Sequence, residues 1–271
     1  MSSVIDAGGG IRCVGLSKVF DGKVAVDIGE MAIPASGIVA VVGPNGAGKT
    51  TLIDILTGFT RPTAGRWWIT GRELTGRSAA VIARAGVART FQEVRFVRDV
   101  SVEENVVLAR RRQCGEKLMN ALVGIGVRSE EFRNRAEAER LLEIVGLDAL
   151  RGVMAQDLSY GQTKLLMIAC LMASEARVMF LDEPVAGVDV QMKVKILSML
   201  NVLKEARRLI LFIEHDVDAV RAVADVVFVM TGGAILTSGP PAEVLARDDV
   251  LDAYVRSSGM YAMSGGVDAL S

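Results

Sequence analysis

The stretch Gly37–Thr50, GIVAVVGPNGAGKT, joins a short apolar run to a loop rich in glycine. The run GIVAVV is continuous and rich in valine, which is typical of a strand buried on both faces. The loop matches the pattern G-x-x-x-x-G-K-[ST], and the residues after it have helical spacing up to Gly58. Strand, loop and helix in this order predict a phosphate-binding loop, because glycines let backbone N–H groups wrap a phosphate chain.

This loop defines the first candidate site residues. We expect Lys49 to reach the β- and γ-phosphates of a nucleotide as a point charge, and the Thr50 hydroxyl to be a ligand of Mg²⁺. The positive end of the helix that follows adds to the attraction for phosphate. The other loop residues expected to bind the nucleotide are Asn45, Gly46, Gly48 and Thr51.

The rest of the chain alternates predicted strands with predicted helices, which favours an α/β fold. The predicted strands are 11–20, 24–33, 177–183 and 209–215, with a closing hairpin over 225–239 that turns at Gly232-Gly233. From about residue 100 to 152 the composition becomes charged and helical, which predicts a helical lobe. Ser101 and Glu104 form the pattern of a capping box at its first helix.

Composition excludes several classes of protein. With 271 residues and 51% apolar content the chain can form a large core, and its net charge of −1 gives no basic field for nucleic acid or anionic lipid. Three widely spaced cysteines predict neither a disulfide framework nor a zinc site, as in a reducing cytosol. The first residues lack the pattern of a secretory signal. The sequence also has no run of about 18 apolar residues, so no membrane span is predicted. The basic run 110–112 is interpreted as a solvated helix face.

Two further segments could complete a phosphate site. VMFLDEP places Asp182 at the end of a buried strand, where it suits Mg²⁺, and Glu183 beside it could polarise an attacking water as a general base. Such a pair alone is more typical of a helix cap or a solvated surface, but its presence in a chain with a phosphate loop favours the functional interpretation. In DLSYGQ, Ser159 caps a helix and Gly161 permits close approach of a ligand. One nucleotide could use both helix starts if two chains meet head to tail.

The single histidine, His215, lies in LILFIEHD. A lone imidazole defines no site by itself and is more often structural. Its interpretation changes because, over nearly its whole length, the chain resembles an ABC-transporter nucleotide-binding subunit. GPNGAGKT resembles the Walker A loop of that family, TFQEV its Q-loop, LSYGQ its signature loop, VMFLDEP its Walker B segment, AGVD its D-loop and IEHD its H-loop.

The resemblance implies roles for individual residues. Gln92 would be the sensor glutamine, acting in catalysis and at the metal, and His215 the switch histidine at the γ-phosphate. Phe20 would stack on adenine, and Gln162 and Asp189 would join Ser159 and Gly161 in binding nucleotide. The catalytic set is then Glu183, His215, Lys49 and Gln92, and the metal set is Thr50, Gln92 and Asp182. Tyr160 departs from the common LSGGQ, and Val188 replaces the common leucine of the D-loop.

The resemblance also implies an architecture. We expect one ABC ATPase domain over residues 11–257, with a P-loop NTPase (RecA-like) core, an antiparallel β subdomain and an inserted helical subdomain. The core lobe would comprise about 11–92 and 175–257, and the helical lobe about 93–174. Residues 1–10 and 258–271 are predicted to be flexible termini.

Within the family the chain is most similar to the LivG-like ATPases of branched-chain amino-acid importers. This similarity implies ATP and Mg²⁺ as cofactors, a second identical or paralogous ATPase subunit, permease subunits and, indirectly, a solute-binding protein. It implies a cytoplasmic place on the inner face of the cell membrane and no nucleic-acid partner. Urea, amide or lipopolysaccharide transporters remain alternatives.

Other classes fit less well. A soluble ABC ATPase that acts on DNA or ribosomes would be expected to show a coiled-coil insertion or tandem cassettes, and the sequence has neither. A P-loop kinase or GTPase would lack the signature loop.

Overall fold

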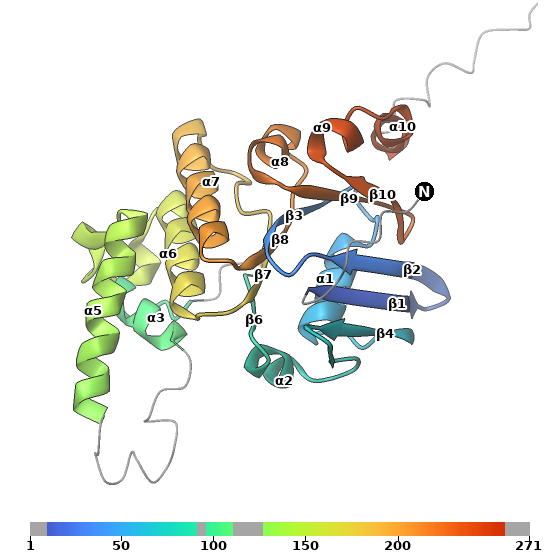
Figure 1. Ribbon diagram of the computed structural model, residues 1–271. Helices are drawn as coiled ribbons and strands as arrows, with labels where there is room; N and C mark the ends of the chain where they lie inside the picture. The colour runs from blue at the N-terminus through green and yellow to red at the C-terminus, as the bar shows by residue number, and fades with distance from the viewer. Residues whose placement is uncertain (1–9, 91–95, 111–126, 258–271) are drawn as a thin grey trace, which may run out of the picture. The chain divides into compact units, whose positions relative to one another are not determined.

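The computed structural model describes residues 10–90, 96–110 and 127–257 (Figure 1). Contacts within the chain divide it into two compact units. Unit 1 comprises Met1–Ile82 and Leu211–Ser271, and unit 2 comprises Ala83–Ile210. Strand β8 (Leu209–Ile213) and helix α2 (Ala79–Arg84) each span a boundary between the units. The division into a core lobe and a helical lobe, as stated in the sequence analysis, remains a prediction.

Unit 1 contains an antiparallel sheet in the order β2-β1-β4-β5. Strand β1 (Ile11–Phe20) turns into β2 (Lys23–Ile33) through Asp21 and Gly22, both of which have positive φ, as a two-residue hairpin requires. Strand β4 (Ala64–Ile69) pairs with β1 and with the short β5 (Arg72–Glu73). Figure 1 shows β1, β2 and β4 side by side.

The second group of strands in unit 1 carries the phosphate loop. Strand β3 (Gly37–Val42) is parallel to β9 (Val226–Thr231), and β9 forms the predicted hairpin with β10 (Ala234–Gly239). Ile38 to Val42 are all buried, which confirms that the valine-rich run is a core strand. The helices of unit 1 are α1 (Lys49–Thr57), α8 (Val217–Val223), α9 (Pro241–Val244) and α10 (Asp248–Ser257).

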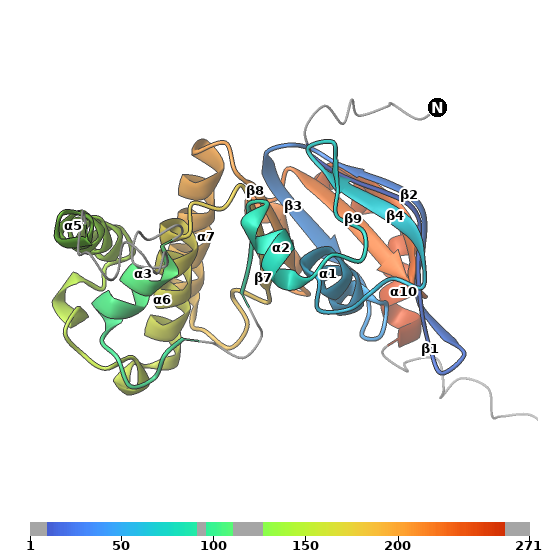
Figure 2. The same cartoon turned by 90° about the horizontal axis from the view of Figure 1, so that it is seen from below.

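Unit 2 combines two parallel strands with a group of helices. Strand β6 (Val87–Arg89) pairs with β7 (Val178–Asp182), all of whose residues are buried. Helices α3 (Val102–Ala109), α5 (Val127–Val145), α6 (Tyr160–Ala173) and α7 (Val190–Glu205) pack on one another, as Figure 2 shows. Two short 3₁₀ turns, Asp148–Leu150 and Ala155–Asp157, precede α6.

Local signals in the sequence account for the helix ends. Ser101 and Glu104 form the predicted capping box of α3, with Ser101 N–H donating to Glu104 Oε2 at 2.9 Å. Gly58 ends α1 in the left-handed conformation, as predicted, because no other residue adopts it so readily. The strands and helices described above together confirm the predicted α/β class. None of the helices within residues 10–90, 96–110 and 127–257 has the length and apolar character needed to cross a membrane.

Candidate phosphate site

The phosphate loop of unit 1 is held between its neighbours by backbone contacts. Gly48 has φ 96°, and a Cβ there would lie 2.1 Å from the carbonyl oxygen of Ala25 on β2. Gly43 is as tightly enclosed, since a Cβ would lie 2.1 Å from the carbonyl oxygen of Met230 on β9. Gly233 N–H donates to Ala47 O at 3.1 Å. The loop therefore keeps its curvature only with glycine at these positions.

Lys49 and the start of α1 give this loop its positive charge. The Lys49 ammonium donates to the carbonyl oxygens of Gly43 and Pro44 at 2.7 and 2.8 Å, so the side chain folds back across the loop. Helix α1 has no acidic residue in its first turn and no side-chain cap, as suits a helix start that binds an anion. Thr50 is exposed and Thr51 is half-buried on the first turn of α1, and Asn45 and Gly46 are exposed in the loop.

The end of β8 presents His215 at the surface of unit 1. Glu214 is buried, and its Oε2 accepts hydrogen bonds from the N–H groups of His215 and Asp216 at 3.2 and 3.5 Å. This fixes the turn that exposes the His215 side chain. Asp216 then caps α8 by accepting from Ala219 N–H at 3.0 Å.

Phe20, the predicted adenine-stacking residue, ends β1 in unit 1. Phe20 is 45% exposed, which leaves room for a planar ligand. The Lys18 ammonium lies 4.6 Å from the ring centroid, within the range of a cation–π interaction. Lys18 was not singled out by the sequence, because an alternating strand places many charged residues on its exposed face.

The carboxylates of the Walker B segment lie at the end of β7 in unit 2. Asp182 is 4% exposed, and its N–H donates to Thr90 Oγ1 at 3.3 Å. Arg89 Nη2 lies 3.5 Å from Asp182 Oδ2. Glu183 follows with φ 47°, a left-handed conformation that is rare for a residue with a Cβ. Such strain is typical of functional sites and persists only when neighbours hold it.

Lys164 on α6 holds the Glu183 backbone. Its ammonium is buried, with Lys164 only 3% exposed, and donates to the carbonyl oxygen of Glu183 at 2.9 Å. The ammonium also lies 5.4 Å from the centroid of the Tyr160 ring. The sequence analysis missed Lys164, since it stands in an apolar helix where a lysine gives no sign of its partner. Lys164 thus connects helix α6, which begins at the signature loop, to the residue that follows strand β7.

We expect Lys164→Met to lower the rate of ATP hydrolysis roughly tenfold, because a lost hydrogen bond from a charged donor is worth about 1.5–3 kcal/mol and Glu183 would relax from its strained conformation. The affinity for ATP should stay within about twofold, because the phosphate loop is untouched. Steady-state hydrolysis and equilibrium ATP binding measure the two effects. Lys164→Arg, which keeps a charged donor, is the control. An unchanged rate in the methionine variant would show that Lys164 does not position Glu183.

The signature loop begins α6 with an exposed Ser159. Ser159 N–H donates to Gln162 Oε1 at 2.8 Å, and Ser159 Oγ accepts from Gln162 N–H at 3.3 Å. A Cβ on Gly161 would lie 2.9 Å from the terminal methyl of Met192, so glycine allows α7 to approach closely. Asp189, the predicted D-loop residue, caps α7 by accepting from Met192 N–H at 2.9 Å. Gln92 lies outside the described residues.

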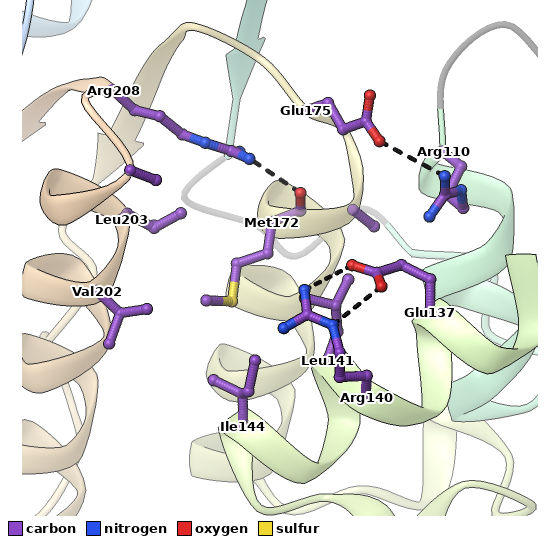
Figure 3. A pocket seen from close by; sticks show the side chains of 12 residues that line it. Arg110, Glu137, Arg140, Leu141, Ile144, Met172, Glu175, Val202, Leu203 and Arg208 are labelled. Atoms are coloured by element: carbon purple, nitrogen blue, oxygen red, sulfur yellow. Dashed lines mark hydrogen bonds and ion pairs between the residues drawn. The ribbon is translucent and has the colours of Figure 1, made fainter.

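Unit 2 also contains a cavity of about 500 Å³, which holds none of the predicted site residues (Figure 3). In it, Arg140 makes two hydrogen bonds to Glu137 at 2.9 and 2.7 Å, which lower the pKa of that carboxyl. Arg110, from the basic run, pairs with Glu175 at 3.5 Å and is only 22% exposed at its side chain. The interpretation of Arg110 as part of a fully solvated helix face is therefore wrong. The other two arginines of the run lie outside the described residues.

The described cysteines are not reactive thiols. Cys13 on β1 and Cys170 on α6 are free, and burial raises the pKa of each to about 12. A thiol with such a pKa is almost entirely protonated near neutral pH, and the thiolate is the nucleophile. The chemistry of this protein therefore does not use either side chain as a nucleophile.

Comparison with known proteins agrees with these features. Residues 27–186 match the family described as ABC transporter. The high-affinity branched-chain amino acid transport ATP-binding protein LivG of Salmonella typhimurium is 36% identical over 248 residues, covering 89% of this chain and 95% of that protein. The corresponding protein BraF of Pseudomonas aeruginosa is 35% identical over the same shares of the two chains.

Structural comparison gives the same family. The crystal structure of the ADP conformation of MJ1267, an ATP-binding cassette of an ABC transporter, superposes with a TM-score of 0.78 and 28% identity, covering 91% of this chain and 98% of that one. The fold is thus that of the P-loop NTPases, as predicted. Together with the phosphate loop, these matches show that the chain belongs to the ABC transporter family, as a subunit that binds and hydrolyses ATP.

Proposed function

We propose that this chain is the ATPase subunit of an importer for branched-chain or related hydrophobic amino acids. The observation that carries the proposal is the 36% identity to LivG of Salmonella typhimurium across nearly the full length of both proteins. Its partners would be a second ATPase subunit, identical or paralogous, and permease subunits that receive substrate from a solute-binding protein. The chain would work at the inner face of the cell membrane.

In the proposed mechanism each sequence motif contributes a different group to the binding or hydrolysis of ATP. Lys49 and the N–H groups at the start of α1 bind and neutralise the phosphates, and Phe20 stacks on adenine. His215 would donate to the γ-phosphate, and Glu183 would accept a proton from the attacking water as general base. Gln92 would link the nucleotide site to the permease, and Asp189 would bind nucleotide beside the signature loop.

The residues present fit a Mg²⁺ ion. Thr50 offers an exposed hydroxyl, and Asp182 offers a buried carboxylate at the end of a rigid strand, both oxygen ligands of the kind Mg²⁺ prefers. Gln92 would be a third ligand. When bound, the ion would neutralise charge on the phosphate oxygens.

The transport function is tested by reconstitution. The chain should be purified with its permease and second ATPase subunit, placed in vesicles, and assayed for hydrolysis with the solute-binding protein present. We expect leucine, isoleucine or valine to raise the rate severalfold, whereas urea or a simple amide should not. Complexes with Lys49→Ala should remain inactive with every solute. Stimulation by urea or amide alone would contradict the proposed substrate and favour the alternative transporter class.

A further inference from the structure

The buried pair formed by Arg89 and Asp182 lies beside the proposed metal site. Arg89 ends β6 and Asp182 ends β7, and the two strands are parallel neighbours in unit 2. The side chains are 8% and 5% exposed, and Nη2 and Oδ2 are 3.5 Å apart. A carboxylate is costly to bury without a compensating charge, and the Arg89 guanidinium supplies that charge beside Asp182.

The backbone around the pair is fixed on both strands. Thr90 N–H donates to Phe180 O at 2.8 Å, and Asp182 N–H donates to Thr90 Oγ1 at 3.3 Å. Thr90 is itself buried. The strand ends therefore present Arg89 and Asp182 to each other in one arrangement, unlike a surface ion pair whose long side chains are free to separate.

The distance between the charges indicates a contact that can be exchanged. A close charge-assisted hydrogen bond between a guanidinium and a carboxylate spans about 2.7–2.9 Å, whereas this pair is separated by 3.5 Å. A bound Mg²⁺ ion, with its double charge, would interact with the carboxylate more strongly than Arg89 does. Arg89 can thus neutralise Asp182 without holding it in the tightest geometry.

We propose that Arg89 is a positioning residue that serves as the counter-ion of Asp182 while the metal is absent, and that it thereby sets the Mg²⁺ concentration at which nucleotide binds. The inference rests on the proposed function, in which Asp182 serves the Mg²⁺ of the nucleotide. Arg89 has two opposing effects on the site. It holds the carboxylate in place, and it must give up part of its contact when the ion binds.

We expect Arg89→Gln to lower the Mg²⁺ concentration for half-maximal nucleotide binding roughly tenfold near neutral pH, since the positive charge that competes with the ion for the carboxylate is removed. Binding of ADP in the presence of EDTA should change less than twofold, because without the ion it depends on Lys49 and the phosphate loop, which the substitution leaves unchanged. Arg89→Lys keeps the positive charge and should stay near the wild-type Mg²⁺ dependence.

The experiment uses the full chain and a fluorescent ADP analogue, titrated with MgCl₂ and in parallel with EDTA. Binding of Mn²⁺ with ADP, followed by electron paramagnetic resonance, reports the ion directly and does not depend on hydrolysis. Arg177→Gln is the matched control, because Arg177 is an exposed arginine just before β7. It should leave both titrations unchanged.

The outcomes separate the inference from the proposed function. An Mg²⁺ dependence that is unchanged or weakened in Arg89→Gln, or an equal loss of binding with and without Mg²⁺, would show that the pair only joins the strands. Asp182→Asn tests the underlying assignment, because it should raise the Mg²⁺ requirement. If Asp182→Asn has no effect, the metal role of Asp182 fails. If it has its effect and Arg89→Gln has none, only the inference fails.

Instability of the neutral variants would not prevent the test. Arg89→Met keeps much of the side-chain volume without the charge, and thermal unfolding can then replace the binding titration. The gain in Tm on adding Mg²⁺ to the ADP-bound protein should be larger in both neutral variants than in the wild type, because the ion replaces the missing counter-ion. An equal or smaller gain would overturn the proposal.

Discussion

Replacing Glu183 with glutamine is expected to lower the rate of ATP hydrolysis by roughly 10²-fold or more, because general base catalysis contributes about that factor. Glutamine keeps the size of the side chain and cannot accept the proton of the attacking water. ATP should still bind, since Lys49 and the phosphate loop are unchanged. The variant should therefore accumulate as an ATP-bound dimer, which size-exclusion chromatography with ATP and Mg²⁺ would detect.

The chain provides a matched control for this substitution. Glu175 also has a left-handed backbone, with φ 52° against 47° for Glu183, but its side chain is 68% exposed and pairs with Arg110. Glu175→Gln should leave hydrolysis within about twofold of the wild type. A wild-type rate of hydrolysis in Glu183→Gln would show that Glu183 is not the general base.

Features set by neighbouring residues could be predicted from the sequence. The phosphate loop was found because its glycines must occupy backbone conformations that other residues avoid, and this demand leaves a fixed spacing in the sequence. The capping boxes at Ser101 and Ser159 involve partners three residues away. Trp67 is fully buried because β4 alternates between two faces of its sheet.

Features set by distant partners could not be predicted. Strand β6 has three residues and depends on its pairing with β7, so it has no periodicity of its own to detect. Lys164 in an apolar helix and Arg89 before the Q-loop are charged residues whose partners, Glu183 and Asp182, are reached only in the folded chain. Glu183 gives no local sign of its left-handed backbone, and one donor to its carbonyl oxygen, Lys164, comes from helix α6.

The second large effect concerns how many chains form one ATP site. Lys49→Ala should abolish hydrolysis in a dimer, since the phosphates lose their principal cation, and Ser159→Arg should do the same by placing bulk and a charge at the signature loop. A dimer of the two different variants is expected to recover activity. The reason is that α1 and α6 both begin without an acidic residue in the first turn, as suits phosphate binding, but only α1 follows the phosphate loop.

The structure supports the choice of Ser159 for this test. Ser159 is exposed, as is Tyr160 at 53%, so the signature loop is accessible to a second chain. The Ser159 hydroxyl already caps its own helix through Gln162, and arginine at this position would lose that cap. The loss costs about 1 kcal/mol of stability, so the variant should remain folded. Thermal unfolding of each variant confirms this before activity is compared.

The mixed dimer distinguishes shared sites from separate ones. If Ser159 of one chain serves the nucleotide on Lys49 of the other, the mixture contains one site with both defects and one with neither. Hydrolysis should then return toward the level of a dimer with a single working site. If each chain completes its own site, every site is damaged and no activity returns. The pair should be tethered and assayed with the permease, so that each measured dimer has one chain of each kind.

The interpretation depends on whether one site can work alone. Strong cooperativity between the sites could keep a shared-site dimer silent even when one site is intact. A tethered dimer with one wild-type chain and one Lys49→Ala chain keeps one complete site in either arrangement and therefore shows whether a single site works alone. A second control, with one wild-type chain and one chain carrying both substitutions, has no complete site in a shared-site dimer, whereas with separate sites it has one. The tethered mixed pair and this second control therefore reverse their activities between the two arrangements. Activity in the mixed pair with silence in the second control establishes the shared site, and the opposite pattern excludes it.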